Sequence, residues 1–203
     1  ANSCRFNDGD SAYMHKTPTS TGNRRVWTLS AWVKRGIIDA SGGQRIFTVS
    51  DADEQEWIGF GQDNIHISRY TDAYVYRYIT TGLYRDPGAW YHIVVAVDST
   101  QGTASNRMKL YVNGTQVTSF GTETVITEDL DTTYNTDDYK HSVGVGGTGS
   151  DGNFMDGYLS EVVLIDGTQY AASDFGEFDE DSPTIWKPKD VSGLTFGTNG
   201  FYL

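Results

Sequence analysis

The sequence predicts an all-β protein, an antiparallel β-sandwich of the jelly-roll type. Aromatic residues make up 13% of its 203 residues and 23 are glycines, a balance typical of strands and tight turns. Ten or more short runs alternate or are rich in β-branched residues, and Gly, Asp and Asn separate them. The sequence has no convincing amphipathic helix. Two packed sheets are therefore expected.

The first half of the chain supplies a series of strand-like runs. In residues 26–35, Trp27, Leu29, Ala31 and Val33 fall on one face, which predicts a strand that borders the core. Turn residues divide the remaining runs of this half, at residues 3–6, 11–16, 44–51, 56–62, 64–70 and 73–79.

The second half contains a run that is apolar on both faces, residues 89–98, which predicts a central strand covered on both sides. Asn113-Gly114 is the pair that best predicts a two-residue hairpin turn. Further strands are expected within residues 108–120, 141–147 and 157–167.

The composition changes near the C-terminus, so residues 1–172 are predicted to form the sandwich and residues 173–203 an extension. The extension is acidic and interrupted by Pro and Gly, yet it retains several aromatic residues. It is expected to pack on the sandwich or to link it to a further domain.

The charge of the chain limits its partners. A net charge of -12 argues against nucleic acid and is compatible with neutral sugars or divalent cations. No apolar run approaches the roughly 18 residues that span a bilayer, so membrane insertion is not expected. Cys4 is the one cysteine, which excludes an intrachain disulfide, and it is expected to be a small core-facing residue.

Four segments, in this order and spacing, resemble the laminin G-like, concanavalin A-like sandwich family. They are "RFNDGDSAYMHK", "VWTLSAWVKR", "DPGAWYHIVVAVD" followed by "MKLYVNGTQV", and "MDGYLSEVVLIDG". The resemblance implies one convex and one concave sheet. It also implies glycan binding on the concave face or at its rim, frequently with a Ca²⁺ ion.

The C-terminal segment "DFGEFDEDSPTIWKPKDVSGLTFGTNGFYL" is similar to one found in structural and tail-associated proteins of tailed bacteriophages. Together the resemblances imply a non-catalytic module on the virion surface that binds cell-surface or environmental polysaccharide. One alternative is a capsid- or tail-decorating module that contacts other virion proteins or copies of itself. A second is a glycan depolymerase.

Aromatic side chains of the middle strands are the candidate ligand-binding residues, because sugar rings stack on aromatic faces. If Val75 and Ile79 face the core, the alternating tyrosines of their strand form an exposed row. The alternatives are a subunit contact and ordinary strand aromatics. The candidates are Trp57, Tyr70, Tyr74, Tyr76 and Tyr78.

Two loops at the ends of the sandwich offer oxygen ligands for Ca²⁺. Asp8 and Asp10 lie in one, and Asp151 and Asp156 in the other. The loops flank the first and last strands, which are expected to be neighbours. The alternative is that these residues only form turns.

The hairpin "SDADEQEW" carries Asp51, Asp53 and Glu56 with a spacing related to that of retaining glycosidases of this fold. Carboxylates at a solvated hairpin keep ordinary pKa values and are poor general acids. The hairpin is therefore interpreted as a turn, and no catalytic residue is predicted.

Overall fold

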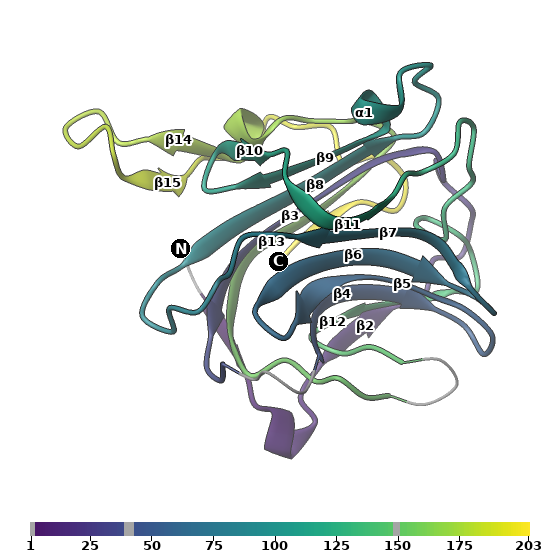
Figure 1. The fold of residues 1–203 in the computed structure, drawn as a ribbon, viewed down its shortest axis with the longest axis horizontal. Coiled ribbons are helices and arrows are strands. Elements are labelled where there is room, and N and C mark those ends of the chain that lie inside the picture. The colour runs from purple at the N-terminus through teal and green to yellow at the C-terminus, as the bar shows by residue number, and fades with distance from the viewer. Residues whose placement is uncertain (1–2, 39–42, 148–150) are drawn as a thin grey trace.

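The computed structural model describes residues 3–38, 43–147 and 151–203. Two sheets, A and B, face each other across a common core (Figure 1). Every named strand pair is antiparallel. The predicted all-β, antiparallel sandwich is confirmed.

Sheet A has seven strands, and its centre is formed by segments far apart in the sequence. The first and last strands of the predicted sandwich are neighbours, as expected. In spatial order the sheet contains β1 (Ser3–Phe6), β13 (Gly157–Asp166), β3 (Val26–Arg35), β8 (Tyr91–Asp98), β9 (Met108–Val112) and β10 (Thr115–Val117), while β16 (Phe201–Tyr202) also pairs with β13.

Sheet B also has seven strands, and four of them follow one another as consecutive hairpins. In spatial order it contains β11 (Phe120–Thr124), β7 (Tyr74–Thr80), β6 (Asn64–Tyr70), β5 (Gln55–Gly61), β4 (Gly43–Ser50), β12 (Lys140–Val143) and β2 (Met14–Lys16).

Helical structure in the described residues is limited to single turns, and a separate two-stranded hairpin precedes β16. The turns are η1 (Asp8–Asp10), α1 (Ala104–Arg107) and η2 (Ala172–Asp174), and the hairpin is β14 (Gly176–Phe178) with β15 (Trp186–Pro188). Within the described residues, no helix has the length and apolar character that a membrane crossing needs.

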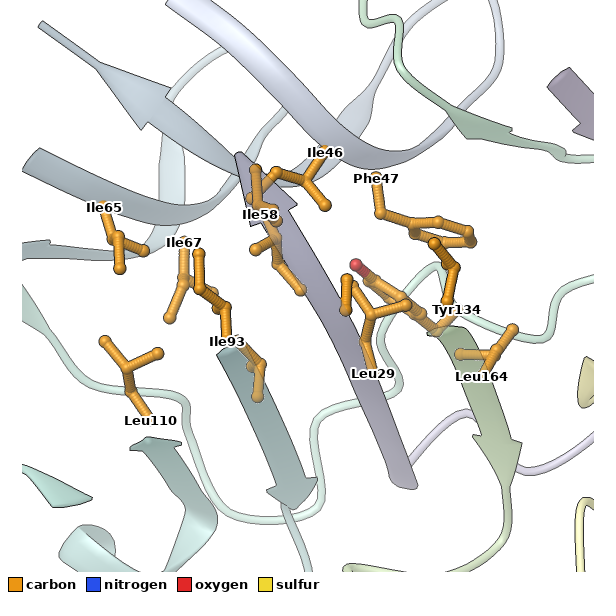
Figure 2. Close-up of a cluster of buried hydrophobic side chains, with 14 of the residues drawn as sticks. Leu29, Ile46, Phe47, Ile58, Ile65, Ile67, Ile93, Leu110, Tyr134 and Leu164 are labelled. Atoms are coloured by element: carbon orange, nitrogen blue, oxygen red, sulfur yellow. The ribbon is translucent and has the colours of Figure 1, made fainter. Parts of the chain in front are cut away.

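The core lies between the sheets and is built from branched aliphatic residues of both. Figure 2 shows Ile58 and Ile67 of sheet B on one side and Leu29 and Leu110 of sheet A on the other. Tyr134, from the loop between β11 and β12, stacks on Trp27 with ring centroids 3.7 Å apart. Alternation in each strand thus sends one face inward, as the sequence of residues 26–35 predicts.

The segment at residues 89–98 becomes the central strand β8, with apolar residues on both faces as predicted. Ile93 faces the main core and Val94 a second cluster on the outer side of sheet A. The turn after β9 is also confirmed, because Asn113 and Gly114 have φ values of 48° and 79°. Both angles are those of a type I′ hairpin turn.

The C-terminal segment covers the outer face of sheet A, where Phe175 and Val191 pack against Val94. Trp186 closes the contact, because its Nε1 donates a hydrogen bond to Nδ1 of His92 at 2.9 Å. This cover explains why strand β8 is buried on both sides.

Cys4 is not buried in the core. It lies on β1, an edge strand of sheet A, and is exposed. The predicted core position is wrong because β1 buries only its last residue, Phe6. A strand at the edge of a sheet needs no apolar side chain at every inward position.

Candidate functional site

Strand β7 follows the predicted pattern only at its start, where Tyr74 is 40% exposed and Val75 packs against the core. Tyr76 and Tyr78 are 0% and 3% exposed and belong to the core, so the prediction that they form an exposed row is wrong. Each hydroxyl has a partner there: that of Tyr76 donates to the Glu56 carboxylate, and that of Tyr78 accepts from the Ile126 amide at 3.0 Å. A satisfied hydroxyl lets tyrosine be buried like any aromatic residue.

On the outer face of sheet B, a row of side chains crosses the sheet. Strand pairing places Trp57 between Thr48 and Ser68, with Ser142 beyond Thr48 and Arg77 beyond Ser68. Each carries a buried polar side-chain atom that has no hydrogen-bond partner in the described part of the chain. Such atoms are costly in a folded protein unless a partner is supplied.

The row borders a pocket of about 390 Å³, here called the Trp57 pocket. Figure 1 shows β4, β5 and β6 arching toward sheet A, so the pocket occupies the hollow side of sheet B. Its lining residues are Gly43, Arg45, Trp57, Gly61, Gln62, Asn64, His66, Tyr74, Arg77 and Ile79.

Aromatic rings and guanidinium groups alternate in this pocket. The Arg45 guanidinium lies 4.7 Å from the Trp57 ring centroid, and that of Arg77 lies 4.3 Å from the Tyr74 ring. The Trp57 and Tyr74 rings are 6.3 Å apart, and Tyr70 meets Tyr74 edge-on at 5.2 Å. Three of the five predicted aromatic residues are therefore brought together.

Glycines make room for the side chains of Arg45 and His66. A Cβ atom at Gly43 would lie 2.5 Å from the Arg45 guanidinium, and one at Gly61 would lie 2.4 Å from the His66 ring. A Cβ at Gly146 would meet the Arg45 stem at 2.6 Å. Larger residues at these positions would displace the side chains that line the pocket.

The electrostatics of the pocket are positive. Burial lowers the pKa of Arg45 to about 10. Burial, together with the charges of Arg77 and Arg45, lowers the pKa of His66 to about 4. No Asp or Glu lines the pocket among the described residues. At neutral pH the site therefore presents two cations and a neutral imidazole.

Sequence reasoning missed Arg45, His66 and Arg77. A signal was available for Arg77, because it alternates with the tyrosines of β7 and must face the opposite side. No local signal marks Arg45 or His66, since they reach the pocket only through the pairing of β4, β5 and β6.

The four predicted calcium ligands do not gather. Asp8 and Asp10 lie in η1, whereas Asp151 forms an ion pair with Lys140. The backbone carbonyl of Asp156 accepts from the Gly36 amide at 2.9 Å. Within residues 3–38, 43–147 and 151–203, no group of three His, Cys, Asp or Glu side chains is placed to hold a metal ion.

The acidic hairpin is a turn, as interpreted from sequence. Asp51 accepts hydrogen bonds from the amides of Asp53 and Glu54 at 2.9 and 2.8 Å. Glu56, however, is 1% exposed and points into the core, where it accepts from the amide and hydroxyl of Thr133, each at 2.8 Å. Burial raises the pKa of Glu56. It lies on the opposite side of β5 from Trp57.

The sequence model of a protein family, the concanavalin A-like lectin/glucanases superfamily, matches residues 7–172. This range includes every strand of the two sheets except β1 and β16. The chain belongs to this superfamily. No curated protein sequence matches the chain.

Solved structures of other members of this fold share little sequence with the chain. The mouse laminin alpha1 LG4-5 domains match with a TM-score of 0.56 and 12% identity, over 95% of this chain and 46% of that one. Tailspike protein 2 of bacteriophage CBA120 matches with a TM-score of 0.53 and 10% identity, over 84% of this chain and 26% of that one. A heptameric pentraxin from Limulus polyphemus matches with a TM-score of 0.52 and 14% identity, over 78% of this chain and 71% of that one. At this identity the matches establish the concanavalin A-like fold alone.

Proposed function

We propose that the chain is a non-catalytic glycan-binding module that holds its ligand in the Trp57 pocket. The observation that carries the proposal is that Arg45, Trp57 and Arg77, which line the pocket with Tyr74, each have a buried polar atom without a partner among the described residues. Saccharides present both C–H faces and hydroxyl groups, so they match rings that alternate with hydrogen-bonding side chains. Membership of a lectin and glucanase superfamily supports the same class of ligand.

Substitution of Tyr74 tests this proposal. Tyr74 is 40% exposed, and Tyr158 on sheet A is 38% exposed, which makes it a matched control. Tyr74→Ala is expected to weaken saccharide binding about tenfold, because it removes one stacking face. Tyr158→Ala is expected to bind like the unmodified protein. Isothermal titration against an oligosaccharide panel measures both, and equal affinities of the two variants would refute the assignment of the pocket.

We further propose that the module is displayed on a bacteriophage virion. The support is the C-terminal segment resembling those of tail-associated proteins, together with the likeness in fold to a phage tailspike. Labelling of intact particles with an antibody against this chain tests the placement. Signal at the particle surface is expected, and its absence from purified particles contradicts the proposal.

The second candidate function is contact with other virion proteins or with copies of the chain. The observation that favours it is the group of exposed apolar residues near the C-terminus: Phe178, Ile185, Tyr202 and Leu203, each 50–56% exposed. Light scattering of the chain tests self-association, and a reconstruction of the particle shows whether β14 and β15 are covered. A monomer with an uncovered hairpin contradicts this candidate function.

We also propose, from the family resemblance alone, that the chain binds a Ca²⁺ ion. A bound ion predicts a higher melting temperature in Ca²⁺ than in EDTA, since ligands of the folded state stabilise it. Identical melting temperatures would contradict the proposal and agree with the scattered positions of the four aspartates.

A further inference from the structure

Arg45 and Arg77 are half-buried cations without an acidic partner. Neither has a carboxylate oxygen within 4.0 Å in the part of the chain that the structure describes. The chain contains 27 acidic residues against 15 Lys and Arg, so acidic side chains are abundant. Ion pairs are formed instead by Arg25, Arg35, Arg69, Arg85 and Arg107.

The unpaired arginines also have unused hydrogen-bond donors. The Nε atoms of Arg45 and Arg77 are buried and have no partner among the described residues. The Trp57 Nε1 atom is also buried and has no hydrogen-bond partner among these residues, and Trp57 as a whole is 5% exposed. Burial without an anion is unfavourable for a guanidinium, and the lowered pKa of Arg45 has the same cause.

We infer that the Trp57 pocket binds an anionic saccharide, a sugar that carries a carboxylate or sulfate group, with the acid group held by Arg45 and Arg77. The inference rests on the proposed glycan-binding function and specifies its ligand class. A guanidinium matches the planar or forked oxygens of these groups and can bind them with paired hydrogen bonds. The exposed Tyr74 ring then contacts the sugar ring, while the buried Trp57 ring supports the Arg45 guanidinium from 4.7 Å.

The rest of the chain favours a short acidic saccharide over a polyanion. With a net charge of -12, the surface as a whole repels long phosphate backbones. The attraction is confined to a pocket of about 390 Å³. His66, with a pKa lowered to about 4, is neutral at pH 7 and can hydrogen-bond sugar hydroxyls.

Isothermal titration with four probes tests the inference: trigalacturonate, a monosulfated galactose trisaccharide, the neutral galactose trisaccharide, and inorganic sulfate. The acidic trisaccharides are compared with each other to separate carboxylate from sulfate. Arg77→Gln removes one cation from the pocket, and Arg45→Gln removes the other. Arg5→Gln is the matched control, because Arg5 is exposed on β1 of sheet A. Melting temperatures establish that each variant is folded.

At least one acidic trisaccharide is expected to bind about tenfold or more tightly than the neutral one, with an affinity that falls as salt is added. The preference is expected to disappear in Arg77→Gln and to persist in Arg5→Gln. Equal binding of acidic and neutral probes overturns the inference and leaves the proposed function standing. Binding of sulfate as tight as that of the sulfated sugar overturns the saccharide assignment, and no binding of any saccharide overturns both proposals.

Discussion

At the scale of single residues, Glu56 shows how a side chain that resembles a catalytic group can serve the core. Its two carboxylate oxygens accept hydrogen bonds from Tyr76 and from Thr133, all of which are buried. The burial of a carboxylate is unfavourable unless hydrogen bonds to it compensate, so the loss of any one of these bonds destabilises the fold. This arrangement connects sheet B to the loop that carries Thr133.

Glu56→Gln is expected to destabilise the fold by about 1–3 kcal/mol, because the new amide group turns a donor toward the donors of Tyr76 or Thr133. Glu123→Gln, on an exposed position of β11, is the control and is expected to change little. Urea unfolding measures both. If the two variants are equally stable, the Glu56 contacts contribute nothing to stability.

His92 is the residue that most clearly links stability to pH. Its ring is 0% exposed, and burial lowers its pKa to about 3. The unfolded chain takes up this proton near pH 6.5, so it binds more protons than the folded chain below that pH. The contribution of His92 is therefore present above pH 6.5 and is lost as the pH falls toward 3.

Between pH 7 and pH 5, His92 is expected to account for a loss of about 2 kcal/mol in the free energy of unfolding. The variant His92→Gln is expected to show a smaller loss over this interval, whatever its stability at pH 7. Replacement of the exposed His15 by Gln serves as the control. Urea titrations at the two pH values measure the loss. If the free energy of unfolding falls as much in His92→Gln as in the unmodified protein, the assignment is contradicted.

At the scale of secondary structure, the C-terminal hairpin is held to sheet A chiefly by Trp186. The indole ring lies against the Asn113-Gly114 turn, where a Cβ atom at Gly114 would approach it to 2.6 Å. It also donates to His92 and meets Phe178 edge-on at 4.9 Å. One side chain thus joins β15 to the hairpin between β9 and β10.

Trp186→Ala is expected to cost about 2–3 kcal/mol, less than the loss of a fully buried Trp, and to expose the hairpin to proteases. Ile185→Ala alters the adjacent residue, which is 56% exposed, and is expected to leave both properties unchanged. Limited proteolysis followed by mass spectrometry detects the cut. Equal protection of the two variants would show that Trp186 does not anchor the hairpin.

The buried face of a strand was predictable where one face of a run is apolar and the other polar, or where both are apolar. β3 and β8 meet these conditions, and the Asn113-Gly114 turn has a local cause in its backbone angles. β7 does not, because tyrosine on one face competes with Val and Ile on the other, and both patterns are consistent with burial. The choice depends on Glu56, which lies 20 residues away and receives the Tyr76 hydroxyl.

For the same reason, the candidate site was only partly predictable. Trp57, Tyr70 and Tyr74 could be proposed as aromatic residues of middle strands. Arg77 had a local signal in its alternation with the tyrosines of β7, but Arg45 could not be added from local sequence, since three strand pairings separate it from Arg77.

At the scale of the whole molecule, the two outer faces of the sandwich differ. The outer face of sheet A is covered by the C-terminal segment and its own apolar cluster. The outer face of sheet B carries the Trp57 pocket, whose cations stand against a net charge of -12. This asymmetry favours sheet B as the ligand-binding face, because its pocket carries a local charge opposite to that of the whole molecule.

The tryptophan indole resonances test this account most directly, because each of the five tryptophans reports on a different place. In a ¹H–¹⁵N correlation spectrum, addition of trigalacturonate is expected to shift the Trp57 Nε1 signal progressively. The Trp27 signal is expected to stay in place, since its Nε1 donates to the buried Thr132 hydroxyl at 2.9 Å. A spectrum in which saccharides move the Trp90 or Trp186 signals and leave Trp57 unmoved would place binding on sheet A and contradict the account.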